Sequence, residues 1–199
     1  MKKRVAREAA ILLYSLHEKE YKQAKKRAAQ TLGVRILPSN IEVAEEIDMI
    51  ADEAEGSFRQ KNLLQMRKDA LWIMKVVQDF HPKLVGSVWR GTAHRNSDID
   101  IKIFSESPKT VLTALQKNNV KIEKTEWCSF TKRGKAENSF HIHLTLPSKN
   151  EVEIVVQNLE NKDKLTRCEI YGDFITGLKY VQLQKILKNN PLIRFTPKH

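Results

Sequence analysis

The run Asp98–Phe104 constrains the fold of this chain more than any other segment, because isoleucine alternates strictly with polar residues along it. Such alternation predicts a β-strand with an apolar face toward a core and a polar face away from it. Asp98 and Asp100 share the polar face. Aspartate is disfavoured in strands, and two of them at this spacing repel each other. We therefore expect a carboxylate pair that holds a cation; the alternative is a solvent-facing edge strand whose polar face happens to be acidic.

A glycine-serine turn precedes this strand. Gly86-Ser87 ends the short apolar run Lys83–Val85, and Ser87 lies eleven positions before Asp98. Glycine allows the backbone to approach a phosphate closely, and the serine hydroxyl and backbone amides can donate hydrogen bonds to it. Mg²⁺ prefers oxygen ligands and typically binds through one or two carboxylates plus substrate phosphates. Together the two features predict a site for Mg²⁺ and a phosphorylated substrate.

The combination resembles the signature of the DNA polymerase beta superfamily of nucleotidyltransferases. The longer strings Val85–Thr92 and Asn96–Ile101 are especially similar to archaeal CCA-adding enzymes and to small stand-alone nucleotidyltransferases of prokaryotes. The resemblance covers roughly residues 81 to 157. It implies an α+β fold in which a small mixed sheet carries the site; an N-terminal three-helix segment, which periodicity predicts, is expected to pack on that sheet.

The resemblance also implies a third carboxylate on a later strand, and the best candidate is Glu153 in the run Glu151–Val156. Most relatives have aspartate at this place, whereas some antibiotic-modifying members have glutamate. Glu153 would bind metal together with Asp98 and Asp100, or act as a general base. Glu151 lies on the same strand face and is an alternative, and a solvent-facing strand with no metal role is another.

Further residues receive expected roles from their position around these motifs. The triphosphate is expected to contact four residues, which are Gly86, Ser87, Arg90 and Ser97, and Arg95 also flanks the turn. His141 and His143 share one strand face and either assist proton transfer or are simply exposed. Trp89 either stacks on a base or packs in the core.

The expected activity is transfer of a nucleoside monophosphate from a nucleoside triphosphate to a hydroxyl group, with release of pyrophosphate and with Mg²⁺ or Mn²⁺ as cofactor. ATP is the expected donor. RNA, protein and small molecules all remain open as acceptors. The resemblance to CCA-adding enzymes does not decide among them, because those relatives hold tRNA with large extra domains for which 199 residues leave no room. The alternatives are a catalytically weak nucleotide- or RNA-binding module and an antitoxin-like protein that binds a partner.

The net charge of +11 is unevenly distributed. Residues 1–35 hold ten Lys and Arg against three acids, whereas residues 42–55 hold seven acids and no base. A basic surface attracts polyanions, so RNA or tRNA is an expected partner. The cations that would contact it near the start of the chain are Lys19, Lys22, Lys25, Lys26 and Arg27. The alternative is that the basic first helix docks beside the acidic second one.

Neither a membrane span nor a signal peptide is visible, and the isolated Cys128 and Cys168 fit a reducing compartment, so we expect a cytoplasmic protein. Periodicity predicts three N-terminal helices: a long one over residues 5–32 with a kink near Glu18, one capped by Ser39 and Glu42, and one over 58–80. They look too polar for a core of their own.

After the carboxylate strand we expect a helix from Ser107-Pro108, three strands within residues 120–156, and a last helix over 178–188. The expected domains are a helical module over residues 1–80, a catalytic domain over 81–160 and a helical extension over 161–199.

Overall fold

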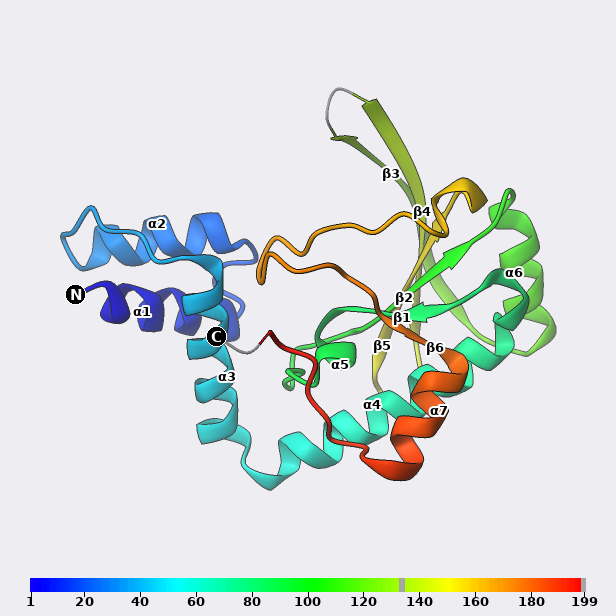
Figure 1. Ribbon diagram of the computed structural model, residues 1–199, viewed down its shortest axis with the longest axis horizontal. Helices are drawn as coiled ribbons and strands as arrows, with labels where there is room; N and C mark the ends of the chain where they lie inside the picture. The colour runs from blue at the N-terminus through cyan, green and yellow to red at the C-terminus, as the bar shows by residue number, and fades with distance from the viewer. Residues whose placement is uncertain (133–134, 198–199) are drawn as a thin grey trace.

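The computed structural model describes residues 1–132 and 135–197, in which helices pack on a mixed sheet (Figure 1). The helices are α1 (Lys2–Tyr14), α2 (Tyr21–Thr31), α3 (Asn40–Glu55), α4 (Ser57–Val76), α5 (Gly86–Arg90), α6 (Pro108–Lys117) and α7 (Tyr180–Asn189), with short 3-10 turns at Gln78–Phe80 and Leu159–Asn161. The strands are β1 (Lys83–Leu84), β2 (Ile99–Phe104), β3 (Ile122–Lys132), β4 (Lys135–Thr145), β5 (Glu151–Gln157) and β6 (Leu178–Lys179). The expected α+β class is confirmed.

The sheet is six-stranded, in the order β3-β4-β5-β2-β1-β6. Strands β2 and β5 are parallel, whereas the other neighbouring pairs are antiparallel. The parallel register places Asp100 opposite Glu153. Because directly opposite residues project from the same face of a sheet, this register brings the carboxylates of two distant segments together.

One face of the sheet is apolar and covered by helices. Ile99, Ile101 and Ile103 of β2 are fully buried there with side chains of α4, α6 and α7. The opposite face carries Asp98, Asp100 and Lys102, as the alternation in β2 predicted. The core therefore fixes the orientation of the polar face.

Helices α1, α2 and α3 have a separate small core, built largely from alanines packed around Val5 and Val43. The expectation that they are too polar for a core of their own is therefore wrong, because small alanines let helices approach closely with little apolar surface. The predicted single helix over residues 5–32 is also wrong. It is two helices, because the chain turns at Ser15–Glu20, where Leu16 has a φ of 60°.

Helix α3 begins with the capping box predicted at Ser39 and Glu42. Its acidic surface lies against α1, where Arg7 pairs with Glu46 and Glu53 and Lys2 pairs with Glu42. Docking of the basic first helix on the acidic one is thus confirmed. None of the helices in the described residues has the length and apolarity needed to cross a membrane.

Candidate active site

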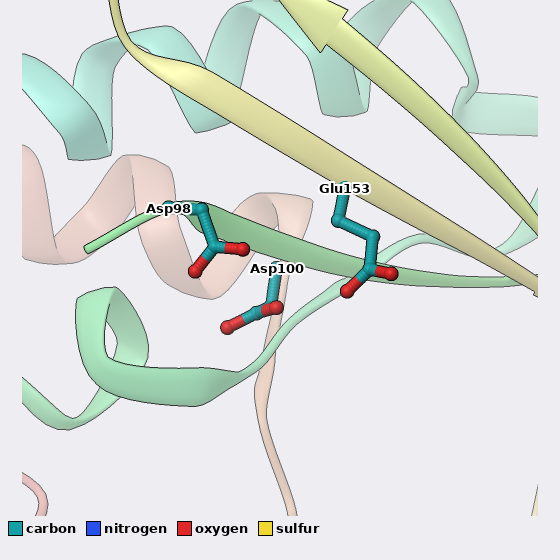
Figure 2. A group of neighbouring side chains, drawn as sticks. All are labelled: Asp98, Asp100 and Glu153. Carbon is teal, nitrogen blue, oxygen red and sulfur yellow. The ribbon is translucent and has the colours of Figure 1, made fainter. Parts of the chain in front are cut away.

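Three carboxylates converge on the polar face of the sheet. Asp98 lies just before β2, Asp100 lies on β2 and Glu153 lies on β5. One oxygen atom from each side chain lies within 4.8 Å of the others, and Figure 2 shows the three side chains leaving the same side of the two strands. Glu151 is not a member of this group. The geometry therefore favours Glu153 over Glu151 as the third carboxylate.

Burial and mutual repulsion destabilise the charged form of this group. Burial, together with the charges of Asp98 and Glu153, raises the pKa of Asp100 to about 8, although nearby Lys102 opposes the shift. Burial also raises the pKa of Asp98, and the charges of Glu153 and Glu151 add to the effect. A divalent cation between the carboxylates would remove the repulsion. The donor set, three carboxylate oxygens that face one another, fits Mg²⁺ or Mn²⁺.

The glycine of the predicted phosphate turn touches this group. Gly86 has a φ of 68°, and a Cβ at this position would lie 1.8 Å from Asp100 Oδ2. The backbone N–H of Val85 donates to the carbonyl of Asp100 at 2.9 Å. A side chain at residue 86 would displace the Asp100 carboxylate, so glycine is required there for space as well as for conformation.

Arg90 and Ser97 are engaged inside the protein. Arg90 is 4% exposed and donates to both carboxylate oxygens of Asp173, at 3.1 and 2.7 Å. Its guanidinium also lies over the rings of Trp89 and Tyr171. Ser97 Oγ accepts a hydrogen bond from the His94 amide at 3.0 Å. Arg90 thus ties α5 to the segment that follows β5, and contacts of Arg90 and Ser97 with a triphosphate stay predictions.

The two histidines of β4 have different partners. His141 Nδ1 lies 2.6 Å from Glu153 Oε1, and its Nε2 lies 2.8 Å from Ser139 Oγ, a buried hydroxyl. His143 instead lies 3.1 Å from Glu126 Oε1. Sequence reasoning missed Ser139, although the alternation of β4 places it on the same face as both histidines. His141 therefore orients one of the three carboxylates, whereas His143 does not.

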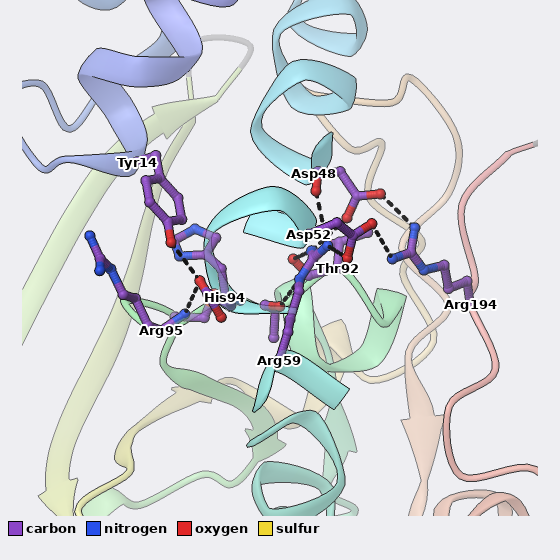
Figure 3. A network of polar contacts seen from close by, with 11 residues as sticks. Tyr14, Asp48, Asp52, Arg59, Thr92, His94, Arg95 and Arg194 are labelled. Carbon is purple, nitrogen blue, oxygen red and sulfur yellow. Dashed lines mark hydrogen bonds and ion pairs between the residues drawn. The ribbon is translucent and has the colours of Figure 1, made fainter. Parts of the chain in front are cut away.

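Two buried arginines of α4 donate hydrogen bonds to the backbone that follows the phosphate turn Gly86-Ser87. Sequence reasoning missed both of them. Arg59 donates to the carboxylates of Asp48 and Asp52 of α3 and to the carbonyls of Thr92 and Ala93. Figure 3 shows the surrounding network, in which Arg194 also donates to Asp48. Arg67 is fully buried and donates to four backbone carbonyls, those of Val88, Trp89, Pro191 and Ile193. No periodic pattern marks such residues.

A basic groove of about 880 Å³ continues the polar face beyond the carboxylates. Lys102 lies two residues after Asp100 on β2, and Lys83 lies opposite Lys102 on β1. Lys164 and Arg167 add positive charge from the segment after β5, and Glu169 is the acidic residue of the lining. The groove is therefore electropositive and adjoins the candidate site.

Comparison with known families agrees with this geometry. Residues 83–175 match the family model described as a nucleotidyltransferase domain. This segment contains the glycine-serine turn, the three carboxylates and Arg90. Residues 83–175 are thus a nucleotidyltransferase domain of the polymerase beta superfamily, as the motifs predicted. The search of curated proteins found no match to the chain.

Proposed function

We propose that the protein is a metal-dependent nucleotidyltransferase. It moves a nucleoside monophosphate from a nucleoside triphosphate to a hydroxyl acceptor and releases pyrophosphate, and ATP is the first donor to test. The observation that carries the proposal is the convergence of three carboxylate oxygens within 4.8 Å, beside Gly86, in a nucleotidyltransferase domain.

Each residue of the group has a role in this proposal. Asp98, Asp100 and Glu153 would hold Mg²⁺ or Mn²⁺, which when bound neutralises charge on the phosphates in the transition state. The amides and hydroxyl at Gly86-Ser87 would orient the terminal phosphates, and Ser97, just before β2, would also contact the triphosphate. His141 holds one oxygen of Glu153 and so fixes the orientation of this carboxylate. His141 is thus a positioning residue for Glu153.

RNA is the acceptor that the surface favours. The basic groove lies on the same sheet face as the carboxylates and carries several cations against one acid. In the groove, Lys83 and Arg167 donate to the carbonyls of Lys162 and Gly172, which are neutral and leave the positive charges in place. Among the cations expected near the start of the chain, Arg27 pairs with the carboxylate of Glu18, and Lys25 donates to Asn40. RNA bound in the groove would reach the carboxylates with its terminal hydroxyl. Protein and small-molecule acceptors are the competing outcomes of the test.

Label transfer from α-labelled triphosphates tests the proposal. The protein is incubated with each of the four nucleoside triphosphates, Mg²⁺, and total cellular RNA and protein. We expect label in RNA with the wild type and none with an Asp98→Asn/Asp100→Asn variant. Label in protein would replace the acceptor but keep the reaction. No transfer with triphosphate binding intact would contradict the proposal and favour a binding module or a partner-binding antitoxin.

A further inference from the structure

A cavity of about 180 Å³ lies beside the phosphate turn, and Gly86 and Ser87 form part of its wall. The rest comes from the remainder of α5 with the loop after it, and from three segments that are far apart in sequence: α2, α3 and residues 168–175. The residues that define its character are Tyr21, Ala44, Ile47, Ile170, Tyr171 and Ile175. Asn40 Nδ2 donates to the carbonyl of Glu169 at 2.9 Å and so holds the 168–175 segment against α3.

The walls are chemically suited to a flat aromatic ring. Two tyrosines and three isoleucines line the cavity, and burial raises the pKa of both Tyr21 and Tyr171. Polar groups enter from Asp48, Thr92 and His94. Ligand sites with apolar and aromatic walls and few polar groups are typical of small molecules with a ring system. The apolar walls offer a phosphate group few partners, and the charged residues among them are already paired, Arg90 with Asp173 and Asp48 with Arg59 and Arg194.

We propose that this cavity receives the nucleoside portion of the donor triphosphate. The inference rests on the proposed function and deepens it. A nucleotide joins an aromatic base to a polyanionic tail, and here an apolar cavity and a phosphate turn share Gly86 and Ser87. The cavity is too small for a polymer, whereas the basic groove is much larger. The helices α2 and α3, which lie outside the matched segment, would thereby form part of the substrate site.

Binding of two probes separates the base from the tail. The full chain is titrated calorimetrically, with Mg²⁺ and no acceptor, with ATP and with inorganic tripolyphosphate. Base stacking and burial contribute roughly five- to 150-fold in affinity per base. We expect ATP to bind at least about tenfold more tightly than tripolyphosphate.

Two variants of the wall and one matched control complete the experiment. Ala44→Leu places added bulk in the cavity from α3, and Ile170→Ser weakens the opposite wall in a loop, where misfolding is less of a risk. Met49→Phe enlarges an exposed side chain on the same helix, outside the cavity. Both wall variants should lose ATP affinity about tenfold and keep tripolyphosphate affinity, whereas Met49→Phe should match the wild type.

The outcomes distinguish the two proposals. Equal affinity of the wild type for ATP and tripolyphosphate, or an unchanged preference in both wall variants, overturns the nucleoside cavity and leaves the proposed function standing. ATP binding that survives in Ala44→Leu while transfer is lost also overturns it, because the cavity would then hold the acceptor. Binding of neither probe contradicts the proposed function itself.

Discussion

The two faces of β2 have opposite effects on the stability of the fold. Ile99, Ile101 and Ile103 bury apolar surface under α4, α6 and α7 and stabilise the fold. Asp98 and Asp100, on the other face of the same strand, hold charges whose burial and repulsion oppose folding while no cation lies between them. The comparison teaches that stability and the candidate chemistry alternate residue by residue along one strand, so single substitutions can separate them.

The largest effect is expected at the contact between the turn and Asp100. In Gly86→Ala the new Cβ would lie 1.8 Å from Asp100 Oδ2, so the carboxylate must move. We expect nucleotidyl transfer to fall on the order of a hundred- to a thousandfold. Gly33→Ala is the matched control, because Gly33 has a similar φ of 64° and nothing within 4 Å of its added Cβ. Equal loss in both variants would attribute the effect to backbone strain alone.

The apolar face is tested at Ile101, which is fully buried. Ile101→Ala should lower the free energy of unfolding by about 3 kcal/mol, because it removes buried methyl groups and leaves a cavity. Ile101→Val should lower it by about 1 kcal/mol. Urea denaturation measures both. If Ile101→Ala lowers the free energy of unfolding but keeps the Mn²⁺ affinity of the wild type at low temperature, the apolar face serves stability and the polar face serves metal binding. An unchanged free energy of unfolding would contradict this division.

The polar face is tested at the two histidines. His141→Ala frees Glu153 from its hydrogen bond, and loss of such a supporting bond typically weakens metal affinity or activity about 10- to 100-fold. His143→Ala is the control, since His143 contacts Glu126 instead. Mn²⁺ binding followed by electron paramagnetic resonance gives a readout independent of turnover, and His141→Gln should restore part of the affinity. Equal Mn²⁺ affinities in His141→Ala and His143→Ala would remove His141 from the site.

The polar face also predicts a pH dependence of stability without metal. The folded-state pKa of Asp100 is raised from 3.8 to about 8, so the folded protein binds this proton more tightly than the unfolded chain does. The free energy of unfolding must then fall as pH rises from about 4 to about 8. In EDTA, Asp100→Asn should have a higher Tm than the wild type at pH 8, and the difference should narrow at pH 5.

Each kcal/mol of difference in the free energy of unfolding between Asp100→Asn and the wild type corresponds to about 2–4 °C in Tm for a chain of this size. Addition of Mg²⁺ to the wild type should reduce this Tm difference, because the cation offsets the repulsion between the carboxylates. A Tm of Asp100→Asn that follows that of the wild type at both pH values would show that the carboxylate is not destabilising.

The sequence predicted what short-range patterns encode. Alternation defined β2, and the capping box at Ser39 and Glu42 defined the start of α3. The choice between Glu151 and Glu153 could not be made, because it depends on the register of β5 against β2, a pairing between distant segments. The two-residue β6 was assigned to the last helix, since two residues carry no periodicity. The contacts of Arg67 and the pairing of Arg90 with Asp173 also join distant segments, so they could not be predicted from the sequence either.

The buried Arg67 has a consequence for the order in which the molecule is assembled. Two of its four carbonyl partners, Val88 and Trp89, follow it closely in the chain, whereas Pro191 and Ile193 are among the last described residues. The amide of Phe195 also donates to the carbonyl of Arg90. During synthesis, a ribosome-bound chain that has not yet reached residue 190 leaves part of this guanidinium without its acceptors. The phosphate turn therefore acquires its full support only after residues 191–195 have been synthesised.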